Sequence, residues 1–241
     1  MIRINKLVLG VLLSLSMLNA NDVYATFTVE PLRDAQLAFI ASGIIGRVNT
    51  DIGHSVKKGE VLAQLDNQDI KAMLEVSKTS LKYAKKDYER QLKIKELIDE
   101  ARFDGVASKY ENAKNQLAYQ QALYNKTFLK APFSGVIYAK DIEIGDAVSA
   151  MMLKTVFQIQ SKSKRKLILA FDQKNRNSVK VGDTFTYNID GDSKIYTGTI
   201  SKIYPRADAK SRKITAEVKT KNFIPGLFGD GYIQVKTQVA K

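Results

Sequence analysis

The side chains that could do chemistry are few in this 241-residue chain, and none of them forms a recognisable catalytic group. The sequence has one histidine, His54, and no cysteine, so neither a thiolate nucleophile nor a disulfide framework is available. His54 lies in the sequence Gly53-His54-Ser55, which is typical of a turn. A transition-metal site would therefore have to use carboxylates or methionines.

Two short sequences contain such groups. Met151-Met152 could attract a soft ion, but adjacent strand residues face opposite ways, so packing in a core or hinge is the better interpretation. Asp190 and Asp192 flank a glycine, which is typical of a turn rather than of an acid–base pair. No glycine-rich phosphate loop and no nucleophile with a base is present. We therefore predict that the protein is not an enzyme and has no cofactor and no metal site.

The feature that organises the chain is a pattern that occurs twice, with an offset of 92 residues. Four glycines mark the matched positions: Gly43, Gly53, Gly135 and Gly145. We interpret them as turns that need positive φ, flanked by short β-branched strands. Two half-domains so far apart can form one sandwich only if the insert leaves and returns at one point. We therefore predict that residues 42–66 and 129–160 form two lipoyl-like halves of one β-sandwich.

Between the two halves, residues 67–128 have a helical period. One apolar stripe runs from Ile70 to Tyr88, and a second runs from Tyr110 to Thr127 in steps of three and four. Because most other faces are polar, these residues are predicted to form an antiparallel coiled-coil arm, about 30–45 Å long at 1.5 Å per residue.

The tip of this arm is predicted where the stripe is broken, from Asp99 to Gly105. Leu97, Ile98 and Phe103 have no evident apolar partner inside the hairpin. Exposed apolar groups flanked by charge at the end of an arm are typical of a binding surface. The alternative is that these groups pack against one another and cap the coiled coil.

The two ends of the chain complete the predicted organisation. Residues 1–25 have the basic start, short apolar run and small residues of a signal peptide, with Ala20 or Ala25 at the cleavage position. Residues 26–41 are predicted to form N-terminal strands that close a small β-barrel made by residues 161–241.

Positive charge is concentrated in the C-terminal module. The chain has a net charge of +13, and residues 161–241 carry 17 Lys and Arg against 7 Asp and Glu. Two interpretations stay open: contact with anionic lipid headgroups or an acidic partner, and a solvated basic surface. Nucleic acid is not expected as a partner, because an exported protein rarely meets it and no motif of aromatic and basic residues is present.

The half-repeats resemble biotinyl and lipoyl carrier domains in the run from Gly53 to Leu62. The hairpin that would bear the modified lysine is replaced by the arm, so Lys71 is expected to be unmodified. That replacement is characteristic of the periplasmic adaptors, or membrane fusion proteins (HlyD/RND-adaptor family), of tripartite efflux pumps. The chain resembles that family in four segments, in order: residues 65–69, 105–111, 129–137 and 198–228.

The resemblance implies a fold that is mainly β plus an α-helical hairpin: a lipoyl-like barrel-sandwich hybrid, an antiparallel coiled-coil arm and a small β-barrel. It implies three partners: an inner-membrane transporter, RND in preference to ABC; a TolC-type outer-membrane duct; and further copies of the chain in a ring of six. The protein would lie in the periplasm, associated with the inner membrane, and serve the export of toxic compounds or drugs.

The resemblance also implies a docking site at the tip. Family members that dock a TolC-type duct have Arg, then Leu four residues on, then Ser seven residues later. Here Lys93 precedes Leu97 by four residues, Ser108 follows eleven residues after Leu97, and Arg90 is the alternative to Lys93. These four residues are expected to contact the duct. Three other functions stay open: an adaptor of an ABC-type exporter, a stand-alone coiled-coil scaffold and a group carrier.

Overall fold

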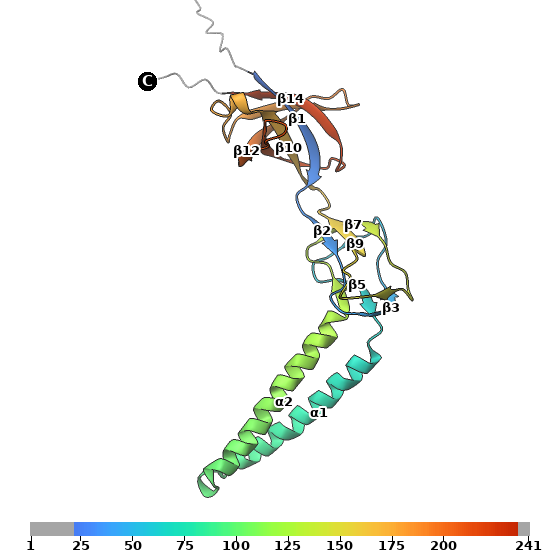
Figure 1. Cartoon of the computed structure of the whole chain (residues 1–241), viewed down its shortest axis with the longest axis vertical. Helices are drawn as coiled ribbons and strands as arrows, with labels where there is room; N and C mark the ends of the chain where they lie inside the picture. Colours follow the sequence, from blue (N-terminus) through green and yellow to red (C-terminus); the bar gives the residue numbers. More distant parts are fainter. Residues whose placement is uncertain (1–21, 236–241) are drawn as a thin grey trace, which may run out of the picture. The chain divides into compact units, whose positions relative to one another are not determined.

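Residues 22–235 are described by the computed structural model, and they form two compact units. The first unit combines residues 22–30 with residues 164–235, and the second comprises residues 31–163. In Figure 1, the blue N-terminal strand β1 lies among the orange and red C-terminal strands of the first unit. Most of the predicted signal peptide lies outside the described residues.

The first unit is a closed six-stranded barrel with the order β1-β10-β13-β12-β11-β14. Its strands are β1 (Asp22–Pro31), β10 (Lys164–Asp172), β11 (Thr184–Ile189), β12 (Tyr196–Ala207), β13 (Lys213–Lys221) and β14 (Phe228–Gln234), with a short 3-10 helix η2 (Gln173–Asn175) after β10. Alternate residues of each strand point inward, and Phe27, Phe171 and Phe185 fill the core. Closure leaves this sheet without a free edge.

The start of β1 bears on where a signal peptide could be cleaved. Val23 and Ala25 are buried in the barrel, and both belong to β1. Cleavage after Ala25 would remove these core residues, whereas cleavage after Ala20 would leave the whole strand in place. Of the two predicted cleavage positions, the burial of Val23 and Ala25 in β1 therefore favours Ala20.

The strands predicted within residues 26–41 do not both close the barrel. Only β1 does so, through its antiparallel pairing with β14. The second strand, β2 (Asp34–Leu37), pairs instead with β9 (Phe157–Gln160) of the second unit. The reason is packing, because Ala35 and Leu37 lie against the core of that unit.

The second unit is built on a β-sandwich of two four-stranded sheets, β2-β9-β7-β4 and β6-β5-β3-β8. The remaining strands are β3 (Gly43–Val48), β4 (Ser55–Val56), β5 (Val61–Leu65), β6 (Phe128–Lys130), β7 (Gly135–Lys140) and β8 (Ala147–Val148). The bounds of β3 and β7 differ by 92 residues, as do those of β4 and β8. The sequence repeat is therefore a repeat of structure.

The four matched glycines have two different roles. Gly53 and Gly145 have φ of 84° and 95° and lie in turns, where only glycine is unstrained. Gly43 and Gly135 are not turns, contrary to the expectation from sequence, because they lie in β3 and β7. Gly135 is needed for a close approach, since a Cβ there would overlap the backbone carbonyl oxygen of Gln160.

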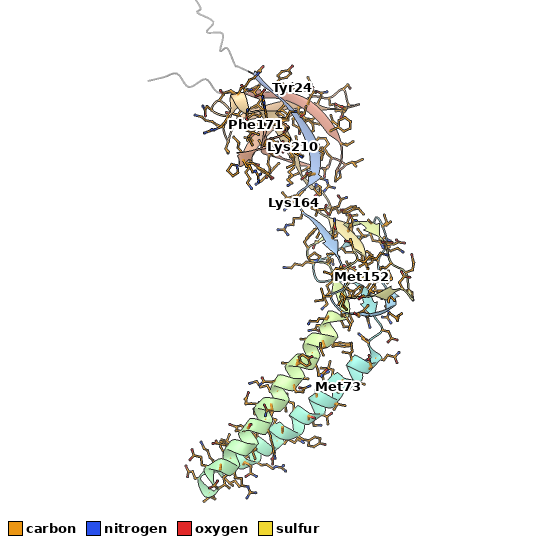
Figure 2. The ribbon with its side chains drawn as sticks, in the orientation of Figure 1. Tyr24, Met73, Met152, Lys164, Phe171 and Lys210 are labelled. Atoms are coloured by element: carbon orange, nitrogen blue, oxygen red, sulfur yellow. The ribbon has the colours of Figure 1, made fainter. Side chains whose placement is uncertain are left out.

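The sequence suggested that Met151 and Met152 pack in a core or hinge, but the structure places them at the surface. Their side chains are 96% and 79% exposed; Met152 is labelled in Figure 2. They follow β8 in the turn that corresponds, 92 residues earlier, to Gly59 and Glu60. A turn position places them in solvent whatever their hydrophobicity.

The helical arm leaves the sandwich between β5 and β6 as α1 (Gln68–Leu92) and returns as α2 (Glu100–Lys126). The predicted stripes form the helix–helix contact, which buries Leu74 and Ser77 of α1 and Gln120 of α2. At its root, the buried side chain of Asn67 donates from Nδ2 to Thr127 Oγ1 at 2.7 Å. This bond joins the two ends of the insert.

We expect Gly135→Ala to destabilise the second unit by at least about 1 kcal/mol, because the added methyl group must displace the backbone at Gln160. Chemical unfolding followed by circular dichroism measures the change. The matched control is Gly105→Ala in α2, where the Cβ meets nothing within 4 Å and should be neutral or stabilising. Equal effects of the two substitutions would contradict the close-approach role of Gly135.

We also expect the sandwich to fold without its arm. A chain in which a short Gly/Ser loop replaces residues 68–126 keeps Asn67, Thr127 and the buried strands of both halves. Differential scanning calorimetry should still show cooperative unfolding of this unit. Loss of the transition would mean that the helices are part of the sandwich core.

Candidate functional site

The tip of the hairpin is a tight connection between residues 93 and 99. After α1 ends at Leu92, a single 3-10 turn, η1 (Lys95–Leu97), reverses the chain. Asp99 then caps α2, because its side chain accepts a hydrogen bond from the backbone N–H of Arg102 at 3.3 Å. The tip predicted from Asp99 to Gly105 is therefore displaced, since Asp99 starts the helix earlier and Gly105 lies inside α2.

Just below the tip, three aromatic rings hold the helices together. Tyr88 and Tyr110 stack with centroids 5.1 Å apart, and the ring of Phe103 lies 5.6 Å from that of Tyr88. The ammonium group of Lys95 sits 4.9 Å from the centroid of Phe103, at cation–π distance. Phe103 is only 7% exposed, so the expectation that it lacks a partner is wrong.

The apex beyond this aromatic cluster is apolar and exposed. Leu97 is 84% exposed, whereas Leu92 and Ile94 are 47% and 42% exposed; Ile98 is half-buried. Sequence reasoning missed Leu92 and Ile94 as surface residues, although both lie outside the interhelical stripe. The exposed fraction of Leu97 is high even for a loop residue, so nothing in the described chain covers it.

The three polar residues predicted for docking lie at two different distances from the apex along the hairpin. Lys93 lies with Leu97 in the connection at the apex. Arg90, whose guanidinium pairs with Asp87 at 3.1 Å, and Ser108 are further back. Each lies two residues nearer the tip than one of the stacked rings, Tyr88 and Tyr110, so both occupy the same level of the hairpin. Because Ser108 follows Leu97 by eleven residues rather than seven, it lies within α2 and not in the connection at the apex.

Two polar side-chain groups near the tip are weakly hydrogen-bonded or unpaired. The Ser108 hydroxyl accepts only a long bond of 3.4 Å from Asn112. The side-chain oxygen of Gln91 is buried and lacks a hydrogen-bond partner within the described residues, a situation that is costly unless a partner supplies a donor. Across residues 22–235, no group of three His, Cys, Asp or Glu side chains could hold a metal ion.

A β-sandwich made of two half-repeats, a helical hairpin inserted between them and a separate β-barrel are the parts of a membrane fusion protein. Residues 33–160 match the family described as "CzcB-like, barrel-sandwich hybrid domain". The chain belongs to this family of membrane fusion proteins, or periplasmic adaptors. Such adaptors are non-enzymatic structural components of efflux pumps.

Sequence similarity to a curated protein is consistent with this family assignment. The cobalt-zinc-cadmium resistance protein CzcB of Cupriavidus metallidurans is 26% identical over 208 residues, which cover 78% of this chain and 40% of that protein. The chain therefore spans less than half the length of that curated relative.

Two solved structures share the fold. A MacA-MexA chimeric protein with the Pseudomonas aeruginosa MexA α-hairpin domain superposes with a TM-score of 0.81 at 19% identity, covering 89% of this chain and 79% of the chimera. The membrane fusion protein Spr0693 of Streptococcus pneumoniae R6 gives 0.73 at 14% identity, covering 89% of this chain and 100% of that one. No helix among the described residues has the length and apolar character needed to cross a bilayer.

The burial pattern separates a structural residue of the tip from an exposed one. We expect Phe103→Ala to destabilise the hairpin by about 2 kcal/mol or more, because it removes a buried ring from the aromatic cluster. Leu97→Ala should change stability by less than about 0.5 kcal/mol, since Leu97 is exposed. Thermal unfolding monitored by helical circular dichroism compares the two. A large loss of stability in Leu97→Ala would contradict its placement at the surface.

Proposed function

We propose that this chain is the adaptor subunit that joins an inner-membrane RND efflux transporter to a TolC-type outer-membrane duct. The single observation that carries the proposal is the exposed Leu97 at the apex of a hairpin whose two ends are joined by a buried hydrogen bond. No residue in the described range 22–235 covers this apolar side chain. Burial against helices of a duct would remove its surface from water.

The proposed contact has an apolar centre and a polar border. Leu97, with Leu92 and Ile94, would be buried against the duct. Lys93 and Arg90 would meet acceptors on the duct, and Ser108 would donate or accept a hydrogen bond.

The proposed transporter and substrate follow from relatives. CzcB is an adaptor of RND-type metal efflux, and its name refers to resistance to cobalt, zinc and cadmium. We propose an RND transporter on this basis, and divalent metal cations as the first toxic compounds to test. The chain would work in the periplasm beside the inner membrane, as a ring of six copies.

Leu97→Asp tests the docking role. We expect this substitution to reduce resistance to the level of a strain without the gene, because a carboxylate cannot be buried against an apolar surface without a partner. The stability of the purified protein should change by less than about 0.5 kcal/mol, since the side chain is exposed. Resistance to zinc, cobalt, cadmium and a panel of drugs is measured alongside crosslinking of the tip to the duct.

The matched control is Ile195→Asp, which places the same charge at a residue of the barrel that is 75% exposed. It should leave crosslinking between tip and duct unchanged. Wild-type resistance in a strain with well-expressed Leu97→Asp protein would remove the docking role. Mass spectrometry of the transporter that co-purifies with the wild-type chain distinguishes an RND pump from an ABC exporter.

A further inference from the structure

The wall of the barrel divides into two halves of unlike charge. In the closed order, β11, β14 and β1 are neighbours, and β10, β13 and β12 make the opposite half. Within their bounds, the first three strands contain no Lys or Arg, but carry Asp22, Glu30 and Asp230, and Asp190 directly follows β11. The other three contain eight Lys and Arg against two carboxylates. We call these the acidic half and the basic half.

The acidic half also exposes aromatic rings. Tyr24, Phe228 and Tyr232 are 50%, 61% and 53% exposed, and they alternate with buried residues along β1 and β14, so they point away from the barrel core. Tyr24 lies opposite Tyr232 across the two strands, and their rings make an edge contact at 5.7 Å. Figure 2 labels Tyr24 on β1. These three exposed rings give one side of the barrel an aromatic surface.

A shallow depression of about 370 Å³ lies mainly in this half, lined by Tyr24, Phe228, Asp190 and Asp230 among others, and it extends to Ile168 and Ala170 of β10. The Tyr24 hydroxyl donates to Asp230 Oδ2 at 2.9 Å. This hydrogen bond to the carboxylate raises the pKa of Tyr24 above its usual value. Carboxylates beside aromatic rings favour a Lys or Arg side chain, through ion pairing and cation–π contact.

The basic half offers such side chains. Lys166 is already engaged, since it lies 3.4 Å from Glu30 and 3.6 Å from Glu217. Lys202 and Lys219 are exposed on β12 and β13. Neither is in an ion pair among the described residues, although the ammonium group of Lys202 lies 5.2 Å from the centroid of the Tyr204 ring. They are therefore available to a partner.

We propose that the acidic half of one barrel binds the basic half of the barrel of a second copy of this chain. The inference deepens the ring assembly of the proposed function, on which it rests, by assigning surfaces to it. Because the two halves face opposite directions, the contact is head-to-tail and leaves one unused half at each end. Repetition of such a contact closes a ring when the rotation permits.

Charge reversal tests the contact in the purified full-length mature chain. The acidic-half variant is Asp190→Lys with Asp230→Lys, and the basic-half variant is Lys202→Glu with Lys219→Glu. We expect each to weaken self-association at least about tenfold, because like charges then face each other. Sedimentation equilibrium at low salt measures it, and wild-type association should fall at 1 M salt, where the Debye length is about 3 Å.

The two variants mixed together should associate as the wild type does, because each supplies the half that the other lacks. A chain that carries all four substitutions should do the same, at the net charge of the wild type. Asp22→Lys with Asp190→Lys is a second acidic-half variant that leaves the Tyr24–Asp230 bond intact. Thermal unfolding verifies that every variant is folded.

The relative orientation of two copies can be tested by crosslinking single introduced cysteines, because the sequence contains no cysteine of its own. Thr28 and Thr199 are exposed on β1 and β12, one in each half. A chain with Thr28→Cys mixed with a chain with Thr199→Cys should give a crosslinked dimer with a short bismaleimide, whereas either chain alone should not.

Several outcomes would overturn the inference: a monomeric wild type, association that ignores both variants, failure of the mixture to recover, or dimers from Thr28→Cys alone. The last three leave the adaptor function intact, because they concern only which surfaces meet. Loss of resistance in Leu97→Asp is measured separately and tests the docking of the tip. Failure of the two proposals is thus distinguishable.

Discussion

The rest of the second unit depends on hydrogen bonds that its two half-repeats exchange. The N–H of Gly53 donates to the carbonyl of Ile137 at 2.8 Å, and the N–H of Gly145 donates to that of Ile45 at 2.9 Å. Each of these bonds maps onto the other when 92 residues are added or subtracted. Each half pairs strands of its own, β3 with β5 and β7 with β9, but the backbone groups of Gly53 and Gly145 find their partners only in the other half, and such groups are costly to leave unpaired. The halves must therefore meet, and whatever lies between them must begin and end at neighbouring points.

An antiparallel helical hairpin meets that requirement because its two ends lie side by side. Its root is fixed by the buried bond between Asn67 and Thr127 and by the donation from the backbone of Leu65 to Thr127. Its far end is fixed by Tyr88, Phe103 and their neighbours rather than by a continuous apolar stripe. Long helices with polar outer faces gain little from propensity alone, so these two anchors hold the arm in register. The result is an apolar apex displayed far from the body that supports it.

The sequence predicted the repeat, the hairpin and the barrel because each depends on a period that a single chain segment displays. It failed where a side chain's environment is made by a distant segment. Phe103 looked unpartnered because Tyr88 and Lys95 belong to the preceding helix and turn. Gly135 looked like a turn because the carbonyl of Gln160 that excludes a Cβ belongs to another strand. At the tip, exposure of Leu97 agrees with the sequence pattern, whereas its contact with a duct remains a prediction.

The acidic and basic halves of the barrel could not be predicted from the sequence for the same reason: each half is made by strands that are distant in the chain. Composition shows only a basic module, because charges are counted along the chain. β1 and β14 are far apart in sequence but paired in the sheet, and their pairing gathers Tyr24, Asp230 and Tyr232 on one side. Along each strand, alternation separates inside from outside, but it does not indicate which neighbouring strand will share a face. Net charge therefore describes solubility and long-range attraction, while the division of charge around the closed wall decides which surfaces can meet.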